Sequence, residues 1–218
     1  KEKSGKTYVS LSLSLGIACK KDPHELWQIN NEINAGVMYC HGEMDDNDIK
    51  ERIDFLKNKL GIEETDINFE SINLRDVKFE NDNGQSQLFN LTEEKCQTYL
   101  RNRVKKFQKE HKNISQTVIV LDNYACLMGT GSQQGDKFNP AYSLIADLQE
   151  NYHCCVILVC HDNQQGAIAS SRQIVRKVDG VIKVSRVAEW KVEIRKSFFN
   201  KANVKNLLDF ETISEELK

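Results

Sequence analysis

Gly5, Lys6 and Thr7 have the types and order that bind the phosphates of a nucleotide. They match the second half of the pattern G-x-x-x-x-G-K-[ST]. In this pattern the glycine lets backbone N–H groups approach a phosphate. The lysine places a positive charge near the β- and γ-phosphates, and the threonine hydroxyl is an oxygen ligand for Mg²⁺. The motif predicts ATP and Mg²⁺ as ligands, with Lys3 and Ser4 in the same loop.

The first glycine of this pattern falls one position before Lys1, so we expect the chain to begin inside the motif. The alternative is a chance Gly-Lys-Thr triplet in a lysine-rich start. A nucleotide site also requires acidic and polar side chains from elsewhere in the chain, and their presence or absence separates the two interpretations.

Three polar side chains follow apolar segments that have the composition of buried strands. They are Glu43 after residues 37–40, Asp122 after residues 117–121, and His161 after residues 154–160. The carboxyl ends of parallel strands meet at one edge of a sheet, and ligands bind there. We therefore expect these three side chains to lie together, near the phosphate-binding motif.

Each of the three has an expected chemical role and a simpler alternative. Asp122 is expected to hold the Mg²⁺ that Thr7 also binds, and the alternative is a solvated carboxylate at a strand end. Glu43 is expected to act as the general base that polarises the attacking water, and the alternative is an acid that stabilises a helix N-terminus. His161 is expected to contact the γ-phosphate as a sensor, and the alternative is a histidine bonded to nearby backbone.

Residues 5–20 are expected to form the helix that follows a phosphate-binding motif, because the N–H groups at its start contribute to phosphate binding. Ser10, Ser12 and Ser14 alternate with apolar residues, and this period of two is typical of a strand instead. The position directly after the motif favours the helix.

Helices and strands alternate along most of the remaining chain. We expect further helices at 25–33, 92–112 and 170–177, one that Asp45 or Asp46 caps and Gly61 ends, and one that begins at Pro140. We expect strands at 37–40, 67–72, 77–79, 117–122, 154–160, 181–184, 191–195 and 207–210. This order indicates an α/β fold with a mostly parallel central sheet flanked by helices and with antiparallel strands at a C-terminal edge. We expect one domain over residues 1–218.

The composition indicates a globular protein without a strongly basic surface. Of the 218 residues, 39% are hydrophobic, and the formal net charge is −2. No apolar run reaches the length of a membrane span, so we expect no membrane partner. The seven cysteines include no C-x-x-C pair, so we expect free thiols in a reduced, cytoplasmic protein and no zinc site.

Several segments, taken in order, resemble the RecA-like P-loop ATPases of the RepA-type hexameric helicase family. They are residues 3–7 with the apolar helix ending in Gly16-Ile17-Ala18, residues 37–44 with Arg52, and residues 118–123, 156–161, 170–172 and 178–182. The resemblance covers nearly the whole chain. It implies a RecA-like core that hydrolyses ATP between adjacent subunits of a ring, which we expect to be a hexamer.

The resemblance also implies partners and further site residues. A basic residue from a neighbouring subunit completes such a site, and Arg195 and Lys196 lie near the family's late basic pair. Residues 129–137 and 162–169 lie where the family contacts single-stranded DNA, although Lys137 is their only basic residue. We expect a replicative helicase or DNA translocase of a plasmid, phage or mobile element. A regulatory or defence ATPase that acts on a protein partner is the alternative, and a P-loop scaffold without turnover is the third hypothesis.

Overall fold

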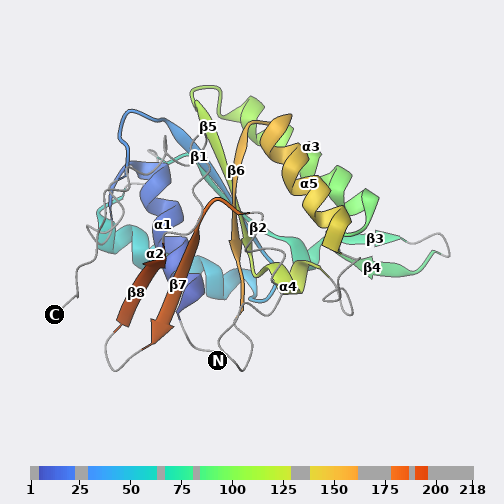
Figure 1. The fold of residues 1–218 in the computed structure, drawn as a ribbon, viewed down its shortest axis with the longest axis horizontal. Helices are drawn as coiled ribbons and strands as arrows, with labels where there is room; N and C mark the ends of the chain where they lie inside the picture. The colour runs from blue at the N-terminus through green and yellow to red at the C-terminus, as the bar shows by residue number, and fades with distance from the viewer. Residues whose placement is uncertain are drawn as a thin grey trace.

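A sheet of four parallel strands, in the order β2-β1-β5-β6, forms the centre of the protein (Figure 1). The computed structural model describes residues 5–22, 29–62, 67–80, 84–128, 138–161, 178–186 and 190–195. The four strands are β1 (Ala35–His41), β2 (Phe69–Asn73), β5 (Gln116–Asp122) and β6 (Cys154–Val159). Strands β1, β5 and β6 come from the near-continuous apolar segments of the sequence, as expected for parallel strands that are covered on both faces.

Helices cover both faces of this sheet. On one face lie α1 (Lys6–Cys19) and α2 (Asp46–Leu60), and on the other lie α3 (Glu94–Glu110) and α5 (Phe138–Glu150) (Figure 1). Val37 packs in the core with α1 and α2, whereas Met38 packs with α3 and α5, because successive side chains of a strand point to opposite faces. The predicted α/β fold with a mostly parallel sheet is confirmed.

The helix α1 forms although its serines alternate with leucines. Ser10, Ser12 and Ser14 are buried together with the leucines between them. Ser10 Oγ donates to the Thr7 carbonyl at 3.0 Å, and Ser14 Oγ donates to the Ser10 carbonyl at 2.5 Å, so the helix itself satisfies these two hydroxyls. A helix that is buried on all sides has no solvated face. Its sequence therefore lacks the alternation of polar and apolar residues with the helical period.

The start of α3 differs from the prediction. We expected Thr92 to open this helix, but it begins at Glu94, after Glu93. The Thr92 N–H and hydroxyl both bond to Asn90 Oδ1, at 3.0 and 2.8 Å. Because this turn occupies the Thr92 side chain, the threonine does not cap the helix.

Two other predicted helices also change. Helix α5 begins at Phe138, so Pro140 stands inside its first turn, where a missing N–H leaves no intrahelical bond unmade. In the segment 25–33, residues 29–33 form a bridge and a turn instead of a helix. The Glu32 N–H donates to Asn30 Oδ1 at 2.9 Å, and this bond favours the turn. The helix predicted at 170–177 and the strand predicted at 207–210 lie outside the described residues.

Two antiparallel pairs of strands lie beside the central sheet, each forming a sheet of its own. They are β3 (Lys78–Glu80) with β4 (Ser86–Leu88), and β7 (Val181–Arg186) with β8 (Trp190–Arg195). The antiparallel pairing near the C-terminus was predicted, and β4 was not. Short helical turns follow β2 and β5, namely η2 (Leu74–Asp76) and α4 (Tyr124–Leu127). None of the described helices has the length and apolar character needed to cross a membrane.

The difference in burial between two phenylalanines predicts how much each of them contributes to stability. Phe107 on α3 is fully buried, whereas Phe55 on α2 leaves 58% of its surface exposed. We expect Phe107→Ala to lower the free energy of unfolding by about 3–5 kcal/mol because it opens a cavity. Phe55→Ala makes the same chemical change at the surface and should cost less than about 1 kcal/mol. Urea unfolding of both variants measures the difference, and similar losses would contradict the burial described here.

Candidate functional site

The register of the parallel strands places their carboxyl ends at one level. His41, the last residue of β1, lies opposite Asp122, the last residue of β5, and Asp122 in turn lies opposite Val159 of β6. Beyond the sheet, the Gly42 N–H donates to the Asp122 carbonyl at 3.0 Å. The segments that follow the three strands therefore leave the sheet side by side.

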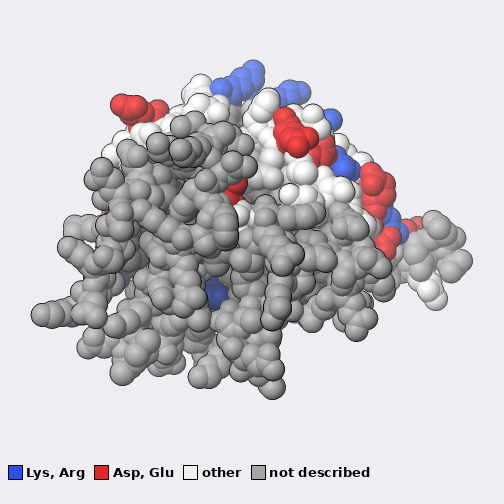
Figure 2. All heavy atoms as spheres, in the orientation of Figure 1, with Lys and Arg blue, Asp and Glu red and all other residues white. Residues whose placement is uncertain are grey.

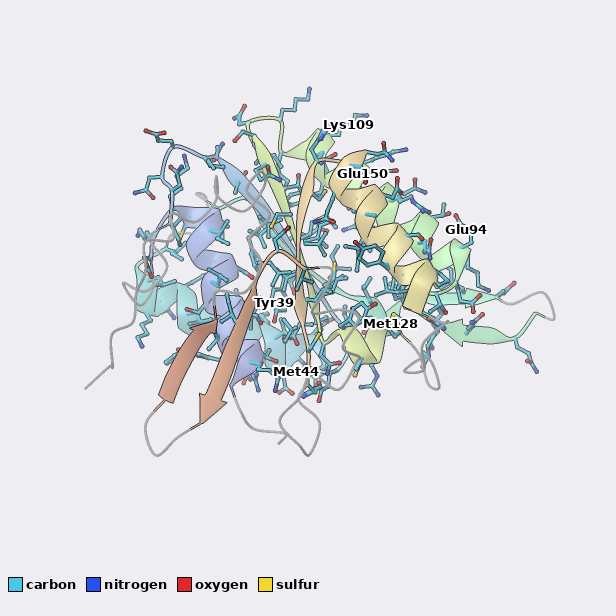
Figure 3. The ribbon with its side chains drawn as sticks, in the orientation of Figure 1. Tyr39, Met44, Glu94, Lys109, Met128 and Glu150 are labelled. Atoms are coloured by element: carbon cyan, nitrogen blue, oxygen red, sulfur yellow. The ribbon has the colours of Figure 1, made fainter. Side chains whose placement is uncertain are left out.

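Gly42 is the residue that lets two of these segments approach each other. A Cβ atom on this residue would lie 2.7 Å from Leu127 Cδ2, which belongs to α4. A larger residue would therefore force the Leu127 side chain to move. In Figure 3, Met44, which follows this turn, and Met128, which follows α4, both lie toward the lower end of the sheet.

Asp122 is held by a buried hydrogen-bond network that joins it to the start of α1. Tyr39 of β1, in the interior of the molecule (Figure 3), donates its hydroxyl proton to Asp122 Oδ2. The Tyr39 hydroxyl lies 2.8 Å from Ser10 Oγ, and Thr7 also hydrogen-bonds to the Asp122 carboxylate. The phosphate-binding motif and the acid at the end of β5 are thus in direct contact.

Burial changes the acidity of both partners in this network. It raises the pKa of Asp122 above the ordinary value of 3.8, and the hydrogen bonds from Tyr39 and Thr7 act in the opposite direction. Burial also raises the pKa of Tyr39 well above 10, and the neighbouring charge of Asp122 adds to this effect. The phenol therefore remains a proton donor to the carboxylate at neutral pH.

A second polar cluster joins Glu43 to His161. Both contact Asn123, which is almost completely buried. Asn123 Nδ2 donates to Glu43 Oε2 and lies 2.7 Å from His161 Nε2, and the glutamate oxygen and the histidine nitrogen are 3.4 Å apart. The predicted meeting of Glu43, Asp122 and His161 at one edge of the sheet is what the structure describes. These contacts do not by themselves establish the roles predicted for the three residues.

The start of α1 is arranged differently from the start of α2. Gly5 precedes α1 with a φ of 75°, in the left-handed region that favours glycine, and it makes no side-chain cap. No acidic residue lies in the first turn of α1. In α2, by contrast, the Asp45 side chain accepts from the Asp48 N–H, and Asp46 and Asp48 lie in the first turn. The first turn of α1 therefore contributes no carboxylate of its own to the positive end of the helix, whereas that of α2 contributes two.

The alternative interpretations of Glu43 and His161 find no support in these contacts. Asp45, and not Glu43, caps α2. His161 contacts two side chains, Asn123 and Glu43, where the alternative expected a bond to backbone.

The structure describes little of the remaining predicted site residues. Lys3, Ser4 and Lys196 lie outside the described residues, as do residues 129–137 and 162–169. Arg195 ends β8, and the structure describes its backbone alone.

Sequence reasoning missed Tyr39, Ser10 and Asn123. Asn123 directly follows Asp122 at a strand end, so the rule that selected Glu43, Asp122 and His161 extends to it. Tyr39 and Ser10 carried no such signal, because both occur in segments that read as apolar core.

The raised pKa of Asp122 predicts a dependence of stability on pH. The folded chain binds this proton more tightly than the unfolded chain, so the contribution is complete below pH 3.8 and is lost as the pH rises through the raised pKa. Asp122→Asn removes the buried charge. We expect the variant, without nucleotide, to be more stable than the parent at pH 7, with a smaller difference at pH 4. Urea unfolding at both pH values measures this.

Asp147 provides the control with the opposite sign. Hydrogen bonds from Asn151 and Arg101 lower its pKa, so its contribution to stability is present above pH 3.8 and is lost as the pH falls. Asp147→Asn should therefore make the protein less stable at pH 7. If Asp122→Asn is also less stable than the parent at pH 7, the buried carboxylate does not oppose folding as described.

Comparison with known proteins identifies the family of this chain. The model of a family described as "AAA domain" matches residues 1–167, which is most of the chain and includes the motif, Glu43, Asp122 and His161. No curated protein matches the chain. The match supports an ATPase of the P-loop kind, which is the broader part of the predicted resemblance. The chain therefore belongs to the AAA domain family and contains a nucleotide-binding ATPase domain of that family.

Proposed function

We propose that this domain hydrolyses ATP at the carboxyl edge of its sheet, using the start of α1 and the ends of β1, β5 and β6. The observation that carries the proposal is the direct contact of Thr7 with Asp122, beside the cluster of Glu43 and His161. These residues come from four separate segments of the chain. Their meeting at the edge where such folds bind ligands supports a common site.

The start of α1 is proposed to bind the triphosphate. Gly5 and the first N–H groups of α1 provide backbone donors, and Lys6 provides a positive charge for the β- and γ-phosphates. The hydroxyl of Thr7 and the carboxylate of Asp122 are adjacent hard oxygens. This chemistry fits a Mg²⁺ ion held by one or two protein oxygens together with phosphate and water oxygens. When bound, Mg²⁺ supplies neutralisation of the phosphate charge.

Glu43 and His161 are proposed to act at the γ-phosphate. Glu43 is half exposed, so its carboxylate is accessible to a water molecule that it orients and from which it accepts a proton. His161 lies 3.4 Å from that carboxylate and is proposed to hydrogen-bond the γ-phosphate. Attack of the water on the γ-phosphorus releases ADP and inorganic phosphate.

We further propose that the protein works as a ring, most simply a hexamer, with the active site between subunits. The charge that develops on the γ-phosphoryl group also requires a cation opposite the motif. Among the arginines whose side chains the structure describes, none hydrogen-bonds to Glu43, Asp122 or His161. Arg195, at the end of β8, or Lys196, the next residue in the sequence, is proposed to supply this charge to the neighbouring subunit. Domains of the AAA family often oligomerise, which supports the ring.

A replicative helicase or DNA translocase of a plasmid, phage or mobile element is the first proposed role. Its support is the likeness of the segments described above to RepA-type hexameric helicases. A regulatory or defence ATPase that acts on a protein partner is the second. Residues 129–137 and 162–169 contain one basic residue, Lys137, and this favours the second role. On the described part of the face in Figure 2, basic and acidic side chains lie next to one another.

Lys6 and Lys20, at opposite ends of α1, provide a matched test of nucleotide binding. In the full-length protein, Lys6→Ala removes the charge nearest the phosphates, and we expect it to weaken ATP affinity at least about a hundredfold. Lys20→Ala removes the same charge from the far end of the helix and should bind ATP like the parent. Titration of a fluorescent ATP analogue measures both. Unchanged affinity in Lys6→Ala would remove the proposed site.

The rate of ATP hydrolysis with and without single-stranded DNA separates the two proposed roles. A translocase couples hydrolysis to movement along the strand, so we expect at least about a tenfold rise in kcat, which corresponds to about 1.4 kcal/mol in the barrier. Equal rates with and without DNA, at low salt where phosphate contacts are strongest, would exclude the first role and leave the second.

Mixed subunits test the shared active site. Arg195→Ala and Lys6→Ala should each be inactive alone, because the first lacks the cation and the second lacks the motif. In a mixture, some boundaries pair an intact motif with an intact Arg195, so part of the ATPase rate should return. Parental activity of Arg195→Ala alone would exclude Arg195, and the same mixture with Lys196→Ala then tests its neighbour.

A further inference from the structure

The side chain of Asn123 has a fixed orientation in the structure. Its Oδ1 accepts the Cys126 N–H at 2.9 Å, as the cap of α4. The amide is 98% buried, so solvent does not compete for its atoms. With the oxygen occupied, the nitrogen must face Glu43 and His161, and both contacts are then donated by Nδ2.

We propose that Asn123 is a positioning residue that holds Glu43 and His161 in one arrangement through its two amide hydrogens. This inference rests on the proposed ATPase function and adds a residue to that site. One hydrogen goes to Glu43 Oε2, and the other goes to His161 Nε2 at 2.7 Å. An asparagine amide has two donor hydrogens, so this arrangement uses both of them and leaves none unpaired.

Because the Asn123 amide nitrogen can only donate, it determines which nitrogen of the neutral His161 ring carries the proton. Since the Asn123 amide donates, His161 Nε2 must accept, and the proton of the neutral ring is on Nδ1. Glu43 Oε2 and His161 Nε2, 3.4 Å apart, are then two acceptors joined by the same amide. A doubly protonated ring would place two donors face to face at 2.7 Å and would have to leave Asn123.

This bridge couples the histidine to the glutamate. If His161 turns toward a phosphate, a buried N–H of Asn123 loses its acceptor, and leaving such a group unpaired is unfavourable. The position of Glu43, which shares the amide, therefore responds to the position of His161. None of the hydrogen bonds described for Asn123 involves Gly5 or Thr7. A substitution of Asn123 should therefore lower turnover and leave nucleotide affinity unchanged.

A purely structural role as the cap of α4 is the competing explanation, and Asn123→Ser separates the two. Serine caps a helix about as well as asparagine but has no amide to reach Glu43 and His161. Asn73 gives the matched control: it is the last residue of β2 in the central sheet, and its side chain accepts the Arg75 N–H at the start of η2. Asn73→Ser makes the same change at the same kind of cap, without a contact to the site.

In the full-length protein, we expect Asn123→Ser to lower kcat about tenfold to a hundredfold, because a shift of about 1 Å in a catalytic group has effects of that size. The KM for ATP and the affinity for an ATP analogue should stay within about twofold of the parent. Asn73→Ser should keep the parental kcat. In a Glu43→Gln background, Asn123→Ser should cause little further loss, because its action passes through Glu43. Asn123→Asp, which also caps a helix, replaces the donor by an acceptor and should lose turnover in the same way.

The ring nitrogens of His161 provide a readout that needs no turnover. In ¹⁵N spectra of the parent, Nε2 should have the shift of an unprotonated ring nitrogen and Nδ1 that of a protonated one. In Asn123→Ser, the two shifts should move toward those of a tautomer mixture. Parental kcat in Asn123→Ser, or a protonated Nε2 in the neutral parent ring, would overturn the proposal. If the parent itself hydrolyses no ATP, the proposed function fails, and the spectra alone decide the arrangement of Asn123.

Discussion

The arrangement of this site depends on the register in which β5 pairs with its two neighbours. Because β1 and β5 end at His41 and Asp122, directly opposite each other, the residues that follow them meet within hydrogen-bond distance. A shift of one residue would turn every side chain of a strand to the other face of the sheet. The register is therefore set by two hydrophobic cores, which require Val37 on one face and Met38 on the other. The site follows from that packing.

The buried carboxylate of Asp122 opposes folding at neutral pH. The pKa of Asp122 is raised because burial disfavours its charge, and the hydrogen bonds from Tyr39 and Thr7 offset only part of that effect. A core without charge would be more stable at neutral pH. A carboxylate held in this way is suited to a divalent cation, because the positive charge replaces the lost solvation. Asp122 thus lowers stability at neutral pH and lies at the position where the proposed Mg²⁺ would bind.

The two polar clusters differ in their contact with solvent, and this difference matches their proposed tasks. Tyr39 and Asp122 are closed off in the core, as suits groups that hold one geometry. Glu43 and His161 are partly exposed, as suits groups that exchange a water and contact a phosphate. Asn123 joins the second cluster from a buried position, next in the chain to Asp122. Family membership establishes the ATPase domain, and these contacts support the roles proposed within it.

The sequence by itself determined the fold class and most of the site. Apolar segments followed by Glu43, Asp122 and His161 were enough to predict a parallel sheet with these residues at one edge, because carboxyl ends of parallel strands always share an edge. Short strands such as β4 had too few residues to give a pattern, and the turn around Asn90 moved the start of α3.

Only the tertiary structure decided which side chains meet. Tyr39 and Asp122 are 83 residues apart in the chain, and Asn123 and Glu43 are 80 apart. Residue types predict that a buried tyrosine hydroxyl or an asparagine amide needs a partner, but they do not say which one. The partner depends on strand register, on the close approach that Gly42 permits, and on the bond from Cys126 that orients the Asn123 amide. These are properties of packing between distant segments, and no local pattern in the sequence contains them.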